Sequence, residues 1–225
     1  MALNLVCNHH GMLALRSASA LRATGVVALA ACALLAAAFA VDASAATGRH
    51  TVPAAGLSLA LPTSWKVVDG SAAAKAAVAS LGKENPQLAG VLSQLGNPGS
   101  VIKFFAFDPV GARTFATNVN VLVSPLPAGV TLAQYLGAAR REFQSLPGRV
   151  GSASTRVVML PGGRAARTDV RFGLTVRGRR LVTDVTQWAF LQPRKSVVVS
   201  YTTTASGAAR YAPTFAASSR SIRFG

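Results

Sequence analysis

The sequence predicts an α+β domain with long antiparallel strands, for two reasons. Segments in which apolar and polar residues alternate fill most of the last third of the chain and are separated by short turns. Residues 131–146 instead carry apolar side chains at the spacing of one helix face. Runs of strands with helices placed irregularly between them are typical of the α+β class.

The first part of the domain is predicted to contain one strand and two short helices. Residues 57–61 alternate Leu with Ser or Ala, and a proline ends this strand before Trp65. An Ala-rich helix is expected over residues 71–81, and a second helix, opened by a proline, over residues 86–95. An Asn-Pro-Gly turn at 97–99 follows.

The middle of the chain is predicted to form two strands and the clearest helix. Residues 102–107 form a mostly apolar strand. Residues 115–123 place three valines on one face and two asparagines on the other. In residues 131–146, five apolar side chains recur at intervals of four and three positions, and Pro147-Gly148 ends this helix.

The last third is predicted to be mainly sheet, and its segments follow in a regular order. Strands are expected over residues 157–160, 166–172, 181–191 and 197–203, with a Pro-Gly-Gly turn after the first and an Arg-Gly-Arg turn after the second. The strand 166–172 alternates apolar and charged residues, so one of its faces should be wet. A final helix over residues 208–220, with a proline in its first turn, precedes two residues expected to dock the C-terminus: Ile222 and Phe224.

Residues 1–45 are predicted to be a secretory leader. Two arginines give it a positive start, an uncharged apolar stretch follows over residues 23–41, and Ala43-Ser44-Ala45 is a small-x-small cleavage site. Cleavage after Ala45 would make Ala46 the new N-terminus. Both cysteines, Cys7 and Cys32, lie in the leader, so the exported chain would contain no disulfide.

Two other interpretations of the leader remain open. Leu29-Ala30-Ala31-Cys32 matches a lipobox, in which Cys32 becomes a lipidated N-terminus, but an apolar run follows this cysteine instead of a polar tether. The apolar stretch also approaches the roughly 20 residues that span a bilayer, which is the property of a retained anchor. Translation could start at Met1 or Met12.

The exported part is strongly basic. The chain has 23 basic and 7 acidic residues, of which the leader contains two and one, so the remainder has a net charge of +15. This surplus favours anionic partners. Arginine also binds phosphate or carboxylate with two hydrogen bonds. We therefore single out the arginines of the predicted hairpin 166–191 as the contact with an anionic partner: Arg167, Arg171, Arg177, Arg179 and Arg180. A solvated basic edge that discourages aggregation is the alternative explanation.

No catalytic or metal site is recognisable, and no cofactor is expected. The exported part has one histidine, His50, and six scattered carboxylates: Asp69, Glu84, Asp108, Glu142, Asp169 and Asp184. Ser80-Leu81-Gly82-Lys83 matches Ser-x-x-Lys, but its companion motifs are absent and a helix end is the simpler explanation. The alternative function is an exported hydrolase with a carboxylate pair or Ser-Lys site assembled by folding.

Large aromatic residues are predicted to form the core. Trp65, Phe143 and Trp188 each lie where a strand or a helix stripe should meet the interior. Stacking on nucleic-acid bases or on sugars is the competing role, but no RNA- or DNA-binding motif accompanies these residues. A nucleic-acid partner is therefore not expected.

The order of several segments resembles that of PsbP-like domains, including the LpqN-type envelope lipoproteins. The matching segments are Gly56–Trp65 (GLSLALPTSW), Thr117–Val121 (TNVNV), Thr131-Leu132, Gln187-Trp188, Val197–Thr202 (VVVSYT) and Ser221–Phe224 (SIRF). The resemblance implies an antiparallel sheet between helices, an α/β/α sandwich, and a non-catalytic module that binds a protein or an envelope molecule. It supplies no catalytic residues, and the poorly placed lipobox is a departure from the LpqN type.

We therefore expect an exported, non-catalytic binding module of the cell envelope. Residues 1–45 would be its signal peptide and residues 46–225 a single domain, a length sufficient for a substantial core. The expected partner is an envelope protein or an anionic envelope surface, either lipid headgroups or a wall polymer. The expected location is secreted, periplasmic or envelope-associated, with no transmembrane helix in the exported form.

Overall fold

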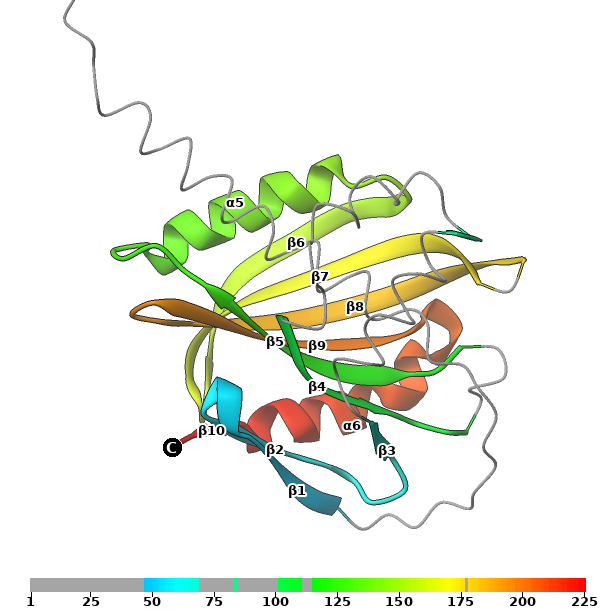
Figure 1. Cartoon of the computed structure of the whole chain (residues 1–225). Helices are drawn as coiled ribbons and strands as arrows, with labels where there is room; N and C mark the ends of the chain where they lie inside the picture. Colours follow the sequence, from blue (N-terminus) through cyan, green and yellow to red (C-terminus); the bar gives the residue numbers. More distant parts are fainter. Residues whose placement is uncertain (1–46, 69–82, 85–100, 111–114, 177) are drawn as a thin grey trace, which may run out of the picture.

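The structure, a computed structural model of the chain, describes residues 47–68, 83–84, 101–110, 115–176 and 178–225 (Figure 1). The predicted leader, the two helices expected over residues 71–95, the turn expected at 97–99 and Arg177 lie outside the described residues. The described residues form two antiparallel sheets with helices on either side, so the predicted α+β class is confirmed.

The larger sheet has seven described strands, and each is antiparallel to its neighbours. In spatial order they are β3 (Lys66–Val68), β4 (Ile102–Phe107), β5 (Asn118–Pro125), β9 (Lys195–Thr204), β8 (Arg179–Gln192), β7 (Gly163–Val176) and β6 (Arg149–Leu160). The strands from β6 to β9 follow one another along the chain and pair as successive hairpins, as their short turns predict.

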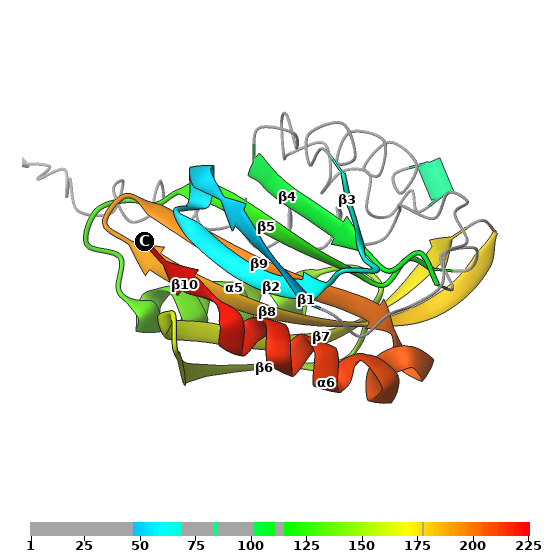
Figure 2. The same ribbon diagram turned by 90° about the horizontal axis from the view of Figure 1, so that it is seen from below.

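The two faces of this sheet are covered differently. Helix α5 (Leu132–Ser145) lies on one face over β6 and β7 (Figure 1). The other face carries helix α6 (Ala208–Ser221) and a small sheet of β1 (Thr47–Val52), β2 (Leu57–Pro62) and β10 (Arg223–Phe224), as Figure 2 shows. No helix within the described ranges is long and apolar enough to cross a membrane.

Most predicted elements are present, and several differ in length. Strand β4 has the predicted bounds, and α5 begins after Thr131, whose side chain and that of Gln134 form a capping box. Strand β6 begins at residue 149 instead of 157, because pairing with β7 extends it through a bulge where Gly151 has a φ of 72°. The expectation that Pro213 lies in the first turn of α6 is wrong, since the helix begins at Ala208.

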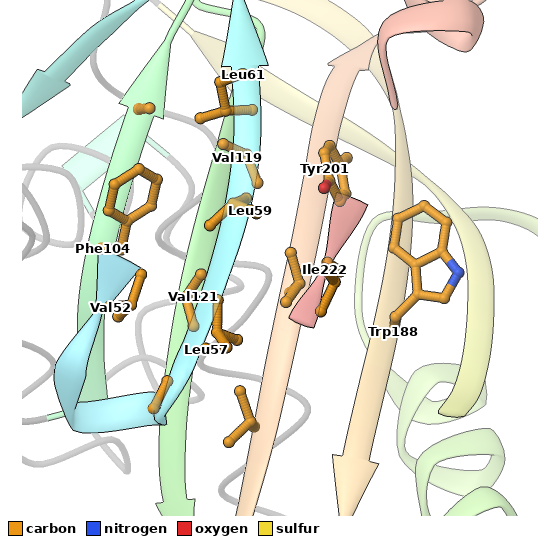
Figure 3. Close-up of a cluster of buried hydrophobic side chains, with 14 of the residues drawn as sticks. Val52, Leu57, Leu59, Leu61, Phe104, Val119, Val121, Trp188, Tyr201 and Ile222 are labelled. Carbon is orange, nitrogen blue, oxygen red and sulfur yellow. The ribbon is translucent and has the colours of Figure 1, made fainter. Parts of the chain in front are cut away.

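The sheet separates two hydrophobic cores. One lies under α5 and contains Phe143, which is 1% exposed. The other lies beneath α6 and the small sheet and contains Trp65 (6% exposed) and Trp188 (5%), so all three predicted core aromatics are buried. Figure 3 shows this second core, where side chains of β2 meet those of β5, β9 and β8.

The C-terminus docks on this second core as predicted. Ile222 is fully buried, and the ring of Phe224 contacts that of Phe190 edge-on, with centroids 5.0 Å apart. Strand β10 also pairs with β2, joining the two ends of the described chain in one small sheet. Full burial of each large apolar side chain contributes about 1.5–3 kcal/mol relative to exposure, so these contacts anchor α6 against the sheet.

Candidate functional site

The β7–β8 hairpin carries the arginines that the sequence singles out. In β7, the even-numbered residues from 166 to 172 are buried, and Arg167, Asp169 and Arg171 lie on the opposite face, as predicted. Because side chains alternate along a strand, the burial of the even-numbered residues places Arg167 and Arg171 on the opposite face of β7.

Arg167 and Arg171 are both paired with carboxylates. The Nε and Nη2 atoms of Arg167 donate to the two carboxylate oxygens of Asp169, each over 2.9 Å. The Nε of Arg171 donates to Oδ1 of Asp184 over 2.6 Å, and its Nη2 donates to Oδ2 over 3.2 Å. The hydrogen bond to Asp184, and next its charge, raise the pKa of Arg171. The charge of both arginines is therefore largely balanced.

Sequence reasoning missed one of these partners. Asp184 lies 13 residues after Arg171, but the β7–β8 register places the two residues directly opposite each other. The other partner, Asp169, accepts a 2.8 Å hydrogen bond from the Thr186 hydroxyl. It also forms an ion pair with Arg156 over 3.5 Å. Along the chain the acidic residue nearest to Arg171 is Asp169, whereas the pairing of β7 with β8 brings Asp184 next to it.

Arg179 and Arg180 lie in a different environment, at the tip of the hairpin. Gly178 has a φ of 72°, which this turn requires and which other residues adopt only with strain. Both arginines are exposed and line a cleft of about 660 Å³ between the start of β8, the end of β9 and the start of α6. Arg177, the remaining predicted contact, lies outside the described residues.

A third arginine lines the same cleft. Arg210 lies in the first turn of α6, 30 residues from Arg180 in sequence. We call the site lined by Arg179, Arg180 and Arg210 the arginine cleft. None of the three forms an ion pair within the described part of the chain. The sequence contains no motif that associates Arg210 with the hairpin, so only the fold could reveal it.

The floor of the arginine cleft is apolar and aromatic, with hydroxyl groups at one side. Phe115, Leu181 and Tyr211 contribute the apolar surface, and Thr204 and Ser206 contribute hydroxyls that lie 3.2 Å apart. Thr204 is the N-cap residue of the short 3₁₀ helix η2 (Ala205–Gly207), and Ser206 lies within it. This helix leads directly into α6.

The carboxylate beneath the cleft is already occupied. Asp108 is buried, its Oδ2 accepts a 2.7 Å hydrogen bond from the Tyr211 hydroxyl, and its Oδ1 accepts one of 2.9 Å from the Val110 amide. Burial, and next the hydrogen bond to Asp108, raise the pKa of Tyr211 to about 12. The guanidinium of Arg210 lies over the Tyr211 ring, 5.3 Å from its centroid. Asp108 therefore supports the floor of the cleft and does not reach its rim.

The start of α6 adds to the positive potential of the cleft. Its N-cap residue, Gly207, provides no side-chain cap, and the first turn contains no acidic residue. A helix N-terminus has a partial positive charge, so a cation such as Arg210 in the first turn is unfavourable there by a few tenths of a kcal/mol to about 1 kcal/mol. An anion in the cleft would remove this cost.

A second groove, of about 520 Å³, lies between α6 and the strands β6–β8. Its lining includes Trp188, Phe215 and Leu160, with Arg167 and Asp184 at the polar side. The guanidinium of Arg167 lies 5.6 Å from the centroid of the Trp188 ring and covers it. Because Trp188 is buried and covered, it does not offer an open ring face for stacking.

Asp169 and Asp184, two of the carboxylates considered for hydrolysis, do not face each other across a cleft. Asp169 and Asp184 are diagonal neighbours on one face of the sheet, and each is bound by arginine instead of facing a partner across a cleft. Glu142 is buried on α5, while Ser80 and Asp69 lie outside the described residues. The described ranges contain no group of three or more His, Cys, Asp or Glu that could hold a metal ion.

Comparison with known proteins shows that this chain is similar to solved structures at the level of the fold. No family model and no curated protein matches the sequence. Structurally, the chain is similar to LpqN of Mycobacterium tuberculosis, with 12% identity, a TM-score of 0.50, and coverage of 74% of this chain and 82% of LpqN. The chain has an LpqN-type fold. The predicted resemblance to PsbP-like domains of the LpqN type is thus confirmed for the fold.

Two further solved structures are similar to this chain with lower TM-scores. The PsbP protein of Synechocystis sp. PCC 6803 is 14% identical, with a TM-score of 0.48 and coverage of 84% of this chain and 98% of that one. A protein of Bacteroides thetaiotaomicron is 12% identical, with a TM-score of 0.42 and coverage of 79% and 48%. The structure of LpqN is described as that of a protein involved in cell envelope biogenesis.

Proposed function

We propose that this chain is an exported, non-catalytic module of the cell envelope that binds an anionic envelope component through the arginine cleft. The observation that carries the proposal is the position of Arg179, Arg180 and Arg210 around one cleft, without a carboxylate partner in the described part of the chain. The leader that the sequence predicts over residues 1–45, and the involvement of LpqN, which has a similar fold, in envelope biogenesis, support an envelope location.

The electrostatics of the cleft favour an anionic partner over a purely solvated surface. Arg167 and Arg171, which lie on the same hairpin, are balanced by aspartates, whereas no ion pair among the described residues involves a cleft arginine. Like charges around a concave surface repel one another, and this surface focuses the positive potential where an anion would enter. Binding of an anion stabilises the arrangement and also increases the rate of encounter.

Binding to defined anionic surfaces tests this proposal. The purified protein is mixed with phosphatidylcholine vesicles containing phosphatidylglycerol, and separately with polyglutamate, at low and high salt. We expect binding to both at low salt and a steep loss at high salt, because salt screens these charges. Replacing Arg179, Arg180 and Arg210 with Ser should weaken binding at least tenfold.

A control variant with the same loss of charge makes this test specific. Arg140 and Arg141 are exposed on α5, and Arg194 is exposed in the β8–β9 turn. The ten residues of β9 separate that turn from the cleft by about 30 Å. Replacing these three with Ser should change binding less than threefold. An equal loss in both variants, or no binding at low salt, would contradict the proposal.

A further inference from the structure

We propose that the arginine cleft is a site for a phosphate ester. Its phosphate group would meet Arg179, Arg180 and Arg210, and its organic part would lie on Leu181 and Val182. This inference rests on the proposed function and specifies the chemical class of the anion. The shared chemistry is that of a phospholipid headgroup or of a soluble phosphorylated molecule, and the experiment below separates these two sources.

The donors of the cleft fit phosphate better than a single carboxylate. The three cations of the described lining are all arginines, each with a planar fork that can donate two parallel hydrogen bonds to an oxyanion. A phosphate group has enough oxygen atoms to accept hydrogen bonds from more than one guanidinium fork, whereas a carboxylate has only two oxygen atoms. The hydroxyls of Thr204 and Ser206 share one hydrogen bond of 3.2 Å, so one of their two protons remains free to donate at the edge of the cleft.

The size and floor of the cleft indicate more than a bare phosphate ion. A volume of about 660 Å³ falls within the range of about 300–1,000 Å³ that is usual for small-molecule sites. Val110, Leu181 and Val182 form an apolar wall beside the arginines, and Val182 is 38% exposed. A ligand with an anionic end and an apolar or ring-shaped body would contact both halves of this lining.

Competition between soluble phosphates and vesicles tests this assignment. Affinities of the purified protein are measured by calorimetry for inorganic phosphate, phenyl phosphate, glycerol 3-phosphate and benzoate. We expect phenyl phosphate to bind at least tenfold more tightly than either inorganic phosphate or benzoate, because it alone combines both features. Equal affinity for benzoate and phenyl phosphate would overturn the phosphate assignment, and equal affinity for phenyl and inorganic phosphate would overturn the apolar subsite.

Vesicles identify the source of the phosphate. If vesicles containing phosphatidic acid compete with glycerol 3-phosphate for the protein, while vesicles with the same charge from oleate do not, the ligand is a headgroup. If glycerol 3-phosphate binds and neither vesicle competes, the ligand is a soluble ester. The absence of binding to every phosphate tested would overturn the inference.

A lysine variant separates this inference from the broader proposal. Replacing Arg179, Arg180 and Arg210 with Lys keeps the charge and removes the forks, so it should retain binding to polyglutamate within threefold and lose at least tenfold in affinity for phenyl phosphate. Unchanged phosphate affinity would contradict a role for the forks. If the serine variant retains binding to polyglutamate and phosphate alike, both the inference and the proposed function fail.

Discussion

Arg171 and Asp184 face each other across the β7–β8 ladder, and the Nε of Arg171 donates a 2.6 Å hydrogen bond to Oδ1 of Asp184. This pair divides the basic hairpin into two parts. Its middle is a balanced network that includes Arg167 and Asp169, and its tip carries Arg179 and Arg180 of the arginine cleft. The two parts should respond differently to mutation.

Removing the Arg171–Asp184 pair should leave anion binding intact. The double change Arg171→Gln and Asp184→Asn keeps the net charge, and Arg171 lies four strand positions from the residue paired with Arg180, or about 13 Å. This distance exceeds the Debye length of about 8 Å at physiological salt. We expect vesicle binding within twofold of the unmodified protein, and a tenfold loss would place the anion contact on the face of the hairpin instead.

Replacing Trp188 with Ala should lower the free energy of unfolding by about 3–5 kcal/mol, because the indole fills the core beneath α6 and packs edge-on against Tyr201 with centroids 5.0 Å apart. Urea denaturation measures this loss. Met159 is 71% exposed, so Met159→Ala is a suitable control that should change stability by less than about 0.5 kcal/mol. A similarly small effect of Trp188→Ala would show that the ring is not part of the core.

The tyrosines should titrate only at strongly alkaline pH while the protein is folded. The chain has three, Tyr135, Tyr201 and Tyr211, and all are buried. Burial raises the pKa of each above the ordinary value of 10, and that of Tyr211 to about 12. The folded state therefore holds these protons more tightly than the unfolded state, so stability should fall as pH rises from 10 through 12.

Absorbance at 295 nm follows this titration. The native protein should show almost no tyrosinate near pH 10, whereas the protein in concentrated urea should ionise all three tyrosines near that pH. A step of tyrosinate absorbance near pH 10, with the circular dichroism of the folded state unchanged, would contradict the burial of at least one ring.

The exported protein should begin at Ala46. Signal peptidase is expected to cleave after Ala45, because Ala43-Ser44-Ala45 provides the small residues that its site requires. N-terminal sequencing or mass spectrometry of the secreted product measures this directly. Replacing Ala45 with Phe should block cleavage and leave the longer chain attached to the membrane. A product that begins at a lipid-modified Cys32 would instead support the lipobox interpretation.

Local patterns in the sequence predicted an element well where burial repeats with the period of that element. In a strand every second side chain is buried, and in a helix every third or fourth. Residues 166–172 and 131–146 are examples, and a capping box at Thr131 and Gln134 further defines the start of α5. The extent of β6 was not predictable, because residues 149–156 lack a regular apolar alternation and become a strand only by pairing with β7. Strand assignment depends on such partners as well as on propensity.

The candidate site also combines features that the sequence predicts with features that only the folded structure creates. The sequence alone determined that the chain is basic, that Arg167 and Arg171 share one face of a strand, and that the large aromatics belong inside, because composition and side-chain alternation are local properties. Only the tertiary structure decided that Asp184 balances Arg171 and that Arg210 joins Arg179 and Arg180 at one cleft. Charges interact through space, over distances set by strand register and helix packing, and residues far apart in sequence become neighbours only when the sheet and α6 have formed.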